Sequence, residues 1–495
     1  MMGYKHGVTG GLGASAVKAV GSATSLPLYV GTAPIGQIPG FATKGLVNTP
    51  LKLTDMAQAK ALLGYSDDWT KFTLCEAVYA HFANAKGNIG PIYVINVLDP
   101  ATHQSTEKTV NLTFTDGKAV IENADAVILD TVALDGKVKG TDFDVTYDIG
   151  SEKATLYSLG TALTGTIEAS YKEMVITSIT SSTIVGTVNT DTGSYTGLQA
   201  GRLIYPRTGD IINMLAAPGW SEIPAVYAGM TAFVQSLNGH WNGYVFADIP
   251  IKEDGTRIDS ISGAKTWKNT KAYDSMFSGI CWPQWKVGGK IYHLSTHALV
   301  EQIRVDNRHN GIPMETMSNE LLGSGTPYFG EDSTNQGYDE TEANELNAVG
   351  IITVSPRGGQ WYLWGPHTAG FVAGSDGNAA EGVDPLAIFI SNIRMQCYIT
   401  NQFQIDNGPE TDGVMPRGLQ QQILFEEQNK LDALAAAGAL IGSPKVSFLE
   451  SQNSTASMVN GNFVWNTVDT PTPPAKSLHN IVSYTDEGFE SFFEE

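Results

Sequence analysis

The end of the chain is the segment that most constrains how this protein folds. A proline-rich hinge, Thr470-Pro471-Thr472-Pro473-Pro474, leads into a stretch of alternating apolar residues from 477 to 484. This alternation predicts a β-strand. A strand that follows a hinge at a chain end has little to pair with in its own domain, so we expect it to pair with another copy of the protein. The tail therefore indicates a subunit of an assembly.

The composition is that of a large globular protein. At 495 residues the chain is too long for one hydrophobic core, and 42% of its residues are apolar, so we expect about two to four domains. The net charge of −21 argues against direct nucleic-acid binding, because phosphate contacts need clustered Lys and Arg. No stretch reaches the ~18 apolar residues of a membrane span, and the first residues lack a secretory leader pattern. We therefore expect neither membrane insertion nor export.

Helix and strand patterns alternate through most of the chain. The predicted elements are strands at 26–32, 91–98, 211–219 and 243–250, helices at 54–63, 72–85, 224–237 and 417–441, and a helix that begins at Asp384-Pro385. The strand at 91–98 is apolar on both faces, which is typical of a parallel sheet. The order strand, helix, strand over 211–250 predicts a βαβ crossover unit.

Residues 109–200 differ from the rest of the chain. They are rich in Thr, Val, Ile and Gly, and turn signals such as Asp116-Gly117 and Asp135-Gly136 separate short alternating stretches. Short strands at roughly ten-residue spacing predict a small β-sandwich or barrel. Helix and strand alternation resumes beyond residue 200, so this domain is expected to be inserted into another.

These patterns predict an α/β and α+β multidomain protein. A central α/β crossover domain carries an inserted all-β domain, sandwich-like or barrel-like, and a C-terminal α+β domain with extended terminal arms completes the chain. The predicted parts are an N-terminal arm (1–20), the first part of the α/β region (21–106), the inserted β-rich domain (107–200), the central α/β domain (201–370), the C-terminal α+β domain (371–475) and a C-terminal arm (476–495).

No segment predicts a catalytic, metal or cofactor site. Gly289-Lys290 lacks the flanking residues of a phosphate-binding loop, and no Gly-x-Ser-x-Gly follows a strand. His293 and His297 have a spacing that could hold zinc on one helical face. The residues between them lack the Glu of a metalloprotease, so we expect ordinary polar histidines. The acidic loop 331–342 lacks the spacing of a calcium loop and is expected to be solvated.

The cysteines and several tryptophans are also expected to have structural roles. Cys75, Cys281 and Cys397 form no CxxC motif and are expected to be reduced core residues of a cytosolic fold. Four tryptophans could form a sugar-stacking surface, although packing in a core or subunit interface is the more common role; they are Trp282, Trp285, Trp361 and Trp364. The alternatives to an assembly subunit are a cytosolic α/β hydrolase, which requires a clustered nucleophile and base, and a carbohydrate-binding protein.

A series of motifs runs along nearly the whole chain outside residues 100–200. They are Tyr4-Lys5-His6-Gly7-Val8, the segment 22–34, Leu215-Ala216-Ala217-Pro218-Gly219, Trp282-Pro283-Gln284-Trp285, Arg304-Val305-Asp306, Gly311-Ile312-Pro313, Ser318-Asn319, the segment 350–368, Leu431-Asp432-Ala433-Leu434, Gly438-Ala439-Leu440 and Thr472-Pro473-Pro474-Ala475-Lys476. In this order they resemble the tail sheath proteins of contractile bacteriophages, a family shared with contractile phage-like particles. Pro366-His367 and Ser477-Leu478 depart from the family pattern.

The resemblance implies a structural protein rather than an enzyme. Sheath subunits of this family stack as rings around an inner tube, and on a trigger from the baseplate they contract and drive the tube through the bacterial envelope for genome delivery. The implied partners are further copies of the chain, the inner tail tube protein, and the baseplate and tail terminator proteins. The implied location is the virion, after assembly in the host cytoplasm. A phage-derived contractile bacteriocin or injection particle fits the same resemblance.

The resemblance also implies roles for particular residues. The two arms would donate strands to neighbouring subunits through Tyr4, His6, Gly7 and Val8 at one end and Leu478, Ile481, Val482 and Tyr484 at the other. The C-terminal domain would sit innermost, and the helix from 417 to 440 would face the tube through Arg417, Gln421, Gln428 and Lys430. The inserted domain would point outward. No cofactor or metal is expected.

Overall fold

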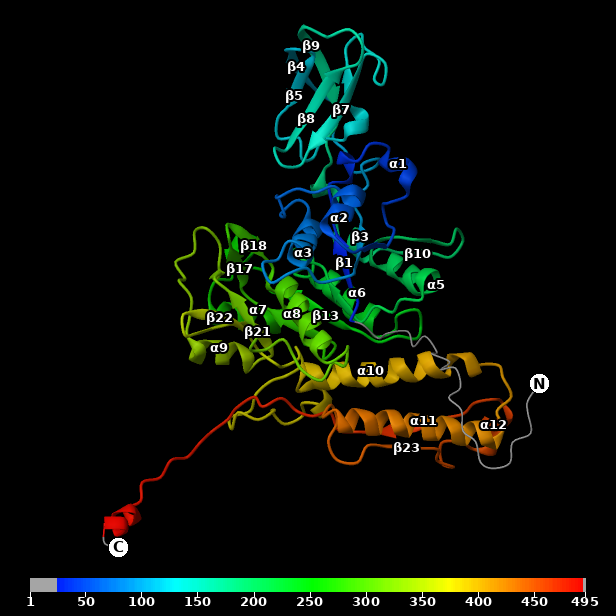
Figure 1. The fold of residues 1–495 in the computed structure, drawn as a ribbon, viewed down its shortest axis with the longest axis vertical. Coiled ribbons are helices and arrows are strands. Elements are labelled where there is room, and N and C mark those ends of the chain that lie inside the picture. The colour runs from blue at the N-terminus through cyan, green and yellow to red at the C-terminus, as the bar shows by residue number, and fades with distance from the viewer. Residues whose placement is uncertain (1–24, 493–495) are drawn as a thin grey trace, which may run out of the picture.

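The computed structural model describes residues 25–492, so the predicted N-terminal arm with Tyr4, His6, Gly7 and Val8 lies outside the described residues. Figure 1 shows an elongated molecule with the inserted domain at one end and the long helices of the C-terminal domain at the other. A large mixed sheet lies between them. The chain is thus a mixed α/β protein of several parts, as the sequence predicts.

The central sheet organises the molecule. Within the described residues it has nine strands in the order β19-β22-β21-β16-β13-β12-β1-β3-β2. Their bounds are β1 (Pro27–Gly31), β2 (Leu51–Leu53), β3 (Ile92–Asn96), β12 (Met214–Ala216), β13 (Tyr244–Asp248), β16 (Ser278–Cys281), β19 (Leu321–Gly323), β21 (Ile351–Arg357) and β22 (Gln360–Trp364). The six from β21 to β3 are parallel, and the edge strands β2, β22 and β19 are antiparallel.

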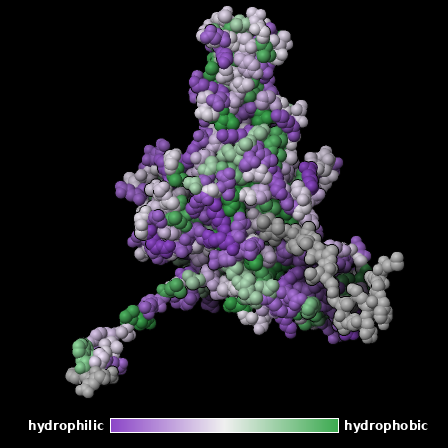
Figure 2. Space-filling view, viewed as in Figure 1, coloured by the Kyte–Doolittle hydropathy of each residue, from purple (hydrophilic) through white to green (hydrophobic). Residues whose placement is uncertain are grey.

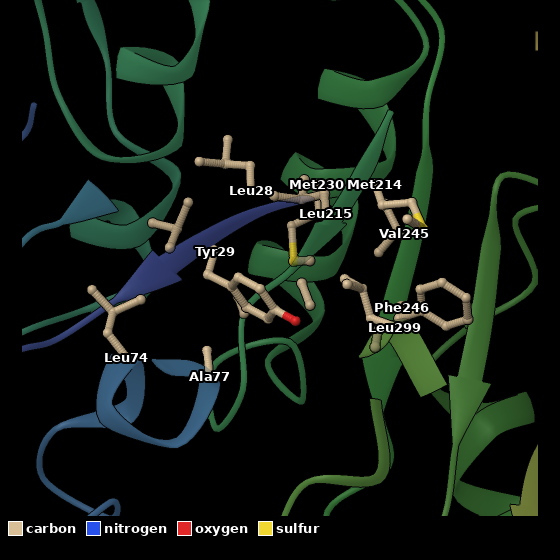
Figure 3. Close-up of a cluster of buried hydrophobic side chains, with 14 of the residues drawn as sticks. Leu28, Tyr29, Leu74, Ala77, Met214, Leu215, Met230, Val245, Phe246 and Leu299 are labelled. Carbon is tan, nitrogen blue, oxygen red and sulfur yellow. The ribbon is translucent and has the colours of Figure 1, made fainter. Parts of the chain in front are cut away.

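The inner strands are short apolar runs, and every residue of β1, β3, β13 and β16 is buried. Helices cover the sheet because a parallel sheet must bury both faces. They are α2 (Met56–Leu63), α3 (Thr73–Phe82), α6 (Pro224–Val234), α7 (Ile261–Thr270), α8 (Leu294–Arg308) and α9 (Glu340–Asn347). Figure 3 shows Leu74 of α3, Met230 of α6 and Leu299 of α8 in the core around the strands. The predicted crossover is confirmed, since β12 and β13 are parallel and α6 joins them.

The predicted helix boundaries near the N-terminus hold in one case and fail in another. The side chain of Asp55 accepts a hydrogen bond from the Gln58 N–H and caps α2, which ends at Gly64 as expected. Helix α3 ends at Phe82 rather than at residue 85. There the side chain of Asn84 accepts a hydrogen bond from the backbone N–H of Lys86, and this local turn competes with a further helical turn.

The inserted domain consists of two three-stranded sheets, β4-β9-β6 and β5-β8-β7. The strands are β4 (Lys108–Phe114), β5 (Lys118–Ile121), β6 (Ala133–Leu134), β7 (Phe143–Asp148), β8 (Lys153–Ser158) and β9 (Gly165–Tyr171). All pairings are antiparallel. Leu112, Phe143 and Leu156 belong to a hydrophobic core of its own, separate from that of the central sheet. The predicted small β-domain is therefore present.

The predicted limit of that domain at residue 200 is wrong. Ile179, Ile184, Leu198 and Ala200 are buried in the core of the central domain. They lie in or beside α4 (Ser181–Val185) and the 3-10 helix η4 (Gly197–Leu203). Thr and Ser remain frequent across the true boundary, so a prediction from composition places the end of the β-domain too late in the sequence. The alternating pattern itself ends with β9.

The C-terminal domain contains two long helices and a small sheet that packs against the second of them. Its elements are α10 (Ile390–Asn407), α11 (Arg417–Ala436), β23 (Lys445–Ser447), α12 (Thr455–Val459) and β24 (Asn466–Val468). Asp384 caps only a 3-10 turn, η5 (Pro385–Ala387), and the first long helix begins later, at Ile390. Helix α11 ends before residue 441, because Gly438 adopts a left-handed conformation with φ +81°. The domain has its own small core around Met395, Leu431 and Val446.

The other helices and strands are short. They are α1 (Phe41–Lys44), α5 (Ile204–Thr208), β10 (Val188–Asn189), β11 (Ser194–Tyr195), β14 (Lys252–Glu253), β15 (Thr256–Arg257), β17 (Gln284–Val287), β18 (Lys290–Tyr292) and β20 (Thr326–Tyr328). Trp282 and Trp285 are fully buried in the central core, which supports packing rather than sugar stacking. The acidic segment is not all loop, because Asp339 caps α9. Its side chain accepts a hydrogen bond from the Glu342 backbone N–H, and the Glu342 side chain accepts one from the Asp339 backbone N–H.

Candidate assembly surfaces

The C-terminal arm leaves the body of the molecule at Lys476. The Lys476 Nζ donates a hydrogen bond of 2.9 Å to the carbonyl oxygen of Gly377 and lies over the Phe371 ring. Beyond this point the chain extends away from the body as far as a short terminal helix (Figure 1). The four predicted contact residues of the arm, Leu478, Ile481, Val482 and Tyr484, are 79–88% exposed. In Figure 2 the arm carries hydrophobic side chains into solvent.

The arm has the properties of a strand without a partner. Residues 477–484 form no ladder with any described part of the chain. An extended segment of this kind presents unpaired backbone N–H and C=O groups together with apolar side chains, and both favour pairing with another sheet. The strand predicted from the alternation is therefore not formed within the chain. Its proposed partner, a neighbouring copy, remains a prediction.

The sheet β23–β24 offers an edge on which a strand could pair. One edge is blocked, because the Gln428 side chain accepts a hydrogen bond of 2.9 Å from the Val446 N–H and donates one of 3.0 Å to the Pro444 carbonyl oxygen. Val446 is opposite Thr467 in the antiparallel register. The backbone groups of Thr467 therefore point to the other edge. Among the described residues the Thr467 N–H has no backbone acceptor there, and Thr467 is exposed. The edge of β24 is open.

The four residues predicted to face the tube divide into two pairs. Arg417 and Gln421 are exposed on α11. Gln428 instead closes the edge of β23, as described above. Lys430 lies 2.7 Å from Asp406 and 2.6 Å from Glu427 and joins α11 to α10. The last two therefore also stabilise the domain itself. The contact of these four residues with a tube stays a prediction.

An exposed aromatic residue on the same helix is not among the predicted contact residues. Phe425 is 67% exposed. The buried face of α11 carries Ile423, Glu427, Leu431 and Leu434, at helical spacing. Phe425 is two residues from Ile423, on the far side of the helix. An aromatic residue out of phase with the apolar stripe was the signal that could have identified it.

A buried ion pair fastens the C-terminal domain to the central one. Arg394 on α10 donates hydrogen bonds of 2.9 and 2.5 Å to Asp306 on α8. Asp306 also accepts from Ser25 and, at 2.8 Å, from Gln302. Both charged side chains are at most 4% exposed. Asp306 lies in the Arg304-Val305-Asp306 motif, and the sequence did not identify its partner.

Next to this contact, the interface between the two domains is incompletely packed. A cavity of about 500 Å³ lies between α10 and the central domain, where Tyr205, Asn213, Tyr398 and Ile405 form part of its lining. Two hydrogen bonds cross the interface nearby, with Asn242 and Asn401 each donating to the other at 2.9 and 2.8 Å. The domains are thus joined by these polar contacts and by the packing of Ile390 and Ile393 in the central core, with a cavity beside them.

A buried polar cluster lies at the carboxyl ends of the central strands. Asp248 ends β13, Glu222 follows β12, and His293 precedes α8. The His293 Nδ1 lies 2.7 Å from Glu76 on α3, and its Nε2 lies 3.5 Å from Glu222. Burial alone would lower the pKa of His293, but Glu76, Glu222 and Asp248 raise it to about 10. Burial raises the pKa of Glu222 to about 7, against the attraction of His293.

The cluster is not a nucleophile and base pair. Ser221 and Ser295 are fully buried, and both hydroxyls donate to Asp248 rather than to the imidazole. His293 is held as a cation by the carboxylates, so it cannot accept a proton near neutral pH. It binds three distant segments of the central domain together. This arrangement gives no support to the hydrolase alternative.

His297, the other predicted polar histidine, is buried in α8, and burial lowers its pKa to about 3. Within residues 25–492, no group of His, Cys, Asp and Glu side chains is arranged to hold a metal ion. The three cysteines are buried with free thiols, as predicted. No helix in the described part of the chain is long and apolar enough to cross a membrane.

Comparison with known proteins supports the predicted resemblance. No family model matches the chain. The chain is 27% identical over 504 residues to the tail sheath protein of Burkholderia phage BcepMu, and the match covers 98% of this chain and 97% of the relative. The resemblance to contractile tail sheath proteins is therefore confirmed at the level of sequence.

Solved structures show the same fold at low sequence identity. A chain in the baseplate of the anti-feeding prophage matches with a TM-score of 0.54 and 12% identity, over 98% of this chain and all of that one. A chain in the contracted PVC sheath complex of an extracellular contractile injection system matches with a TM-score of 0.54 and 13% identity, over 99% of both chains. The fold described above is shared along the whole length.

Proposed function

We propose that this chain, a homologue of contractile tail sheath proteins, is a structural sheath subunit. Many copies stack around an inner tail tube and contract to drive the tube through the bacterial envelope for genome delivery. The observation that carries this proposal is the match to a phage tail sheath protein over 98% of the chain. The subunit acts by mechanical coupling rather than by catalysis.

The C-terminal arm supplies the coupling. It projects from the body with Leu478, Ile481, Val482 and Tyr484 exposed, and its backbone is unpaired in the described structure. The β24 edge of a second copy presents free backbone groups at Thr467, whereas the β23 edge is closed by Gln428. The arm of one subunit therefore adds a strand beside β24 of the next. The proline-rich hinge at 470–474 lets the body of each subunit rotate, while the backbone hydrogen bonds between the arm and β24 of the next subunit persist.

The arrangement of domains supports an inner and an outer side. The inserted β-domain and the C-terminal helices lie at opposite ends of the molecule (Figure 1). The C-terminal domain lies nearest the tube and presents Arg417 and Gln421, and the inserted domain points outward. The N-terminal arm, with Tyr4, His6, Gly7 and Val8, donates a second strand; this part of the proposal is supported by the family resemblance.

The sheath of a phage-derived contractile particle is the second candidate. The similar solved structures come from the anti-feeding prophage and from an extracellular contractile injection system. In either setting the subunit contacts further copies of itself, the tube, the baseplate and the terminator. A phage tail places it in the virion after assembly in the host cytoplasm.

Negative-stain electron microscopy of the purified chain tests the proposal. Tubes or stacked rings are expected from the intact protein. Deletion of residues 476–495 is expected to leave a folded, soluble subunit that does not polymerise. Tubes from this truncated protein would reject strand donation by the C-terminal arm. A stable monomer with hydrolytic turnover would reject the sheath.

A further inference from the structure

The last residues of the arm form a feature that strand donation leaves unexplained. A 3-10 helix, η7 (Glu487–Phe492), closes the arm and begins three residues beyond the exposed Tyr484. Phe489 and Phe492 lie one turn apart on it, with their rings stacked at a centroid distance of 6.1 Å. They are 60% and 78% exposed. Two large aromatic side chains held together in solvent indicate a contact surface.

The helix combines these rings with negative charge. Asp486, Glu487 and Glu490 lie within five residues of one another around the two rings. On a surface of this composition, the complementary partner presents an apolar side chain next to a cation. A strongly acidic surface would repel it, and a purely polar surface would give the two rings no apolar contact.

The position of the helix limits where that partner can be. Phe489 is five residues from Tyr484, so the fully extended chain lets it reach about 17 Å beyond the donated strand. If the arm pairs beside β24 of a second copy, as the proposed function requires, the rings must contact that same copy close to its β23–β24 sheet.

One face of that sheet is not covered by any helix of residues 25–492 and has the required composition. Helix α11 covers the other face, where Val446 is buried. On the open face Lys445 is directly opposite Val468 in the register. Val468 is 62% exposed, and Lys445 is exposed and forms no ion pair with the described residues. Opposite side chains in a sheet lie about 5 Å apart at Cβ, so the cation and the apolar group form one patch.

We infer that η7 is an anchor for the donated strand. Phe489 and Phe492 of one copy pack on Val468 of a second copy, and Glu487 and Glu490 lie next to its Lys445. The arm binds the second copy through backbone hydrogen bonds, which allow more than one register. The anchor fixes the register of the arm along β24, because its side chains fit only one position on that copy. This inference rests on the proposed strand donation and adds a second contact to it.

Two truncations separate the anchor from the strand. One ends after Thr485 and removes only the anchor, and the other ends after Pro474 and removes both. The readout is the lowest protein concentration at which tubes pellet, with thermal melting to verify folding. The first truncation is expected to need at least tenfold more protein than the intact chain, and the second to form no tubes. Phe489→Ser with Phe492→Ser should behave as the first truncation.

A charge reversal tests the receiving face. Lys445→Glu is expected to raise the required concentration severalfold, and combining it with Glu487→Lys and Glu490→Lys should restore assembly. Lys118→Glu, at an exposed position of β5 in the inserted domain, is the matched control and should have no effect. If the Thr485 truncation assembles like the intact chain while the Pro474 truncation does not, the anchor is rejected and strand donation stands. If both assemble normally, or the intact chain forms no tubes, both are rejected.

Discussion

Replacing Arg394 is expected to weaken the attachment of the C-terminal domain to the central domain. Its guanidinium and the Asp306 carboxylate form a bidentate pair with almost no solvent contact. Arg394→Met preserves most of the side-chain length but leaves Asp306 as a buried carboxylate without a cation. Ser25 and Gln302 still donate hydrogen bonds to it, so the charge is partly compensated.

The structure sets the expected size of the effect. Removing one partner of a buried ion pair costs about 3–5 kcal/mol. Because two hydrogen-bond donors remain, we expect a value near 3 kcal/mol, which is roughly a hundredfold change in the equilibrium constant. The matched control is Arg308→Met. Arg308 lies on α8, as Asp306 does, and pairs with Glu320, but its side chain is 50% exposed. An exposed pair contributes at most about 1 kcal/mol.

Urea unfolding followed by tryptophan fluorescence measures the loss, and limited proteolysis shows whether the C-terminal domain is released first. A second variant, Arg394→Met with Asp306→Leu, removes both charges and should recover more than half of the lost stability, because no unpaired carboxylate remains. Equal effects of Arg394→Met and Arg308→Met would refute the assigned role. So would a double variant as unstable as the single one.

Three further predictions concern other parts of the chain. Burial raises the pKa of Glu222 from 4.5 to about 7, so the folded protein loses stability as the pH rises from 4.5 to 7. Glu222→Gln should therefore stabilise the protein at pH 8 by up to about 3 kcal/mol and change its stability little at pH 4.5. Thermal melts at both pH values measure this difference. Gly186→Ala should destabilise the protein by more than about 3 kcal/mol in urea titrations, because Gly186 has φ +68° and a Cβ there would lie 1.8 Å from the Thr196 carbonyl oxygen. An unchanged free energy of unfolding would contradict this prediction. Phe143→Ala should cost the inserted domain about 3–5 kcal/mol, seen by calorimetry as an earlier local transition, while tubes still form; loss of tubes would show that this domain takes part in assembly.

Local patterns in the sequence were enough for much of the fold. The apolar runs of β1, β3 and β13 can be satisfied only in a sheet covered on both faces, so a parallel α/β core followed from them. Asp55 and Gly64 bounded α2, because caps act within a few residues. The exposed C-terminal arm could be predicted because the proline-rich hinge at 470–474 precedes an alternating apolar stretch at 477–484.

Contacts between distant segments required the tertiary structure. Nothing near Asp306 in the sequence indicates Arg394, 88 residues away, and nothing near Gln428 shows that it closes the edge of β23. The limit of the inserted domain was misplaced because composition does not report which core Ile179 or Leu198 packs in. Sequence periodicity records the local backbone and the side that is buried. The partner on the buried side depends on packing over the whole chain, and only the folded structure shows it.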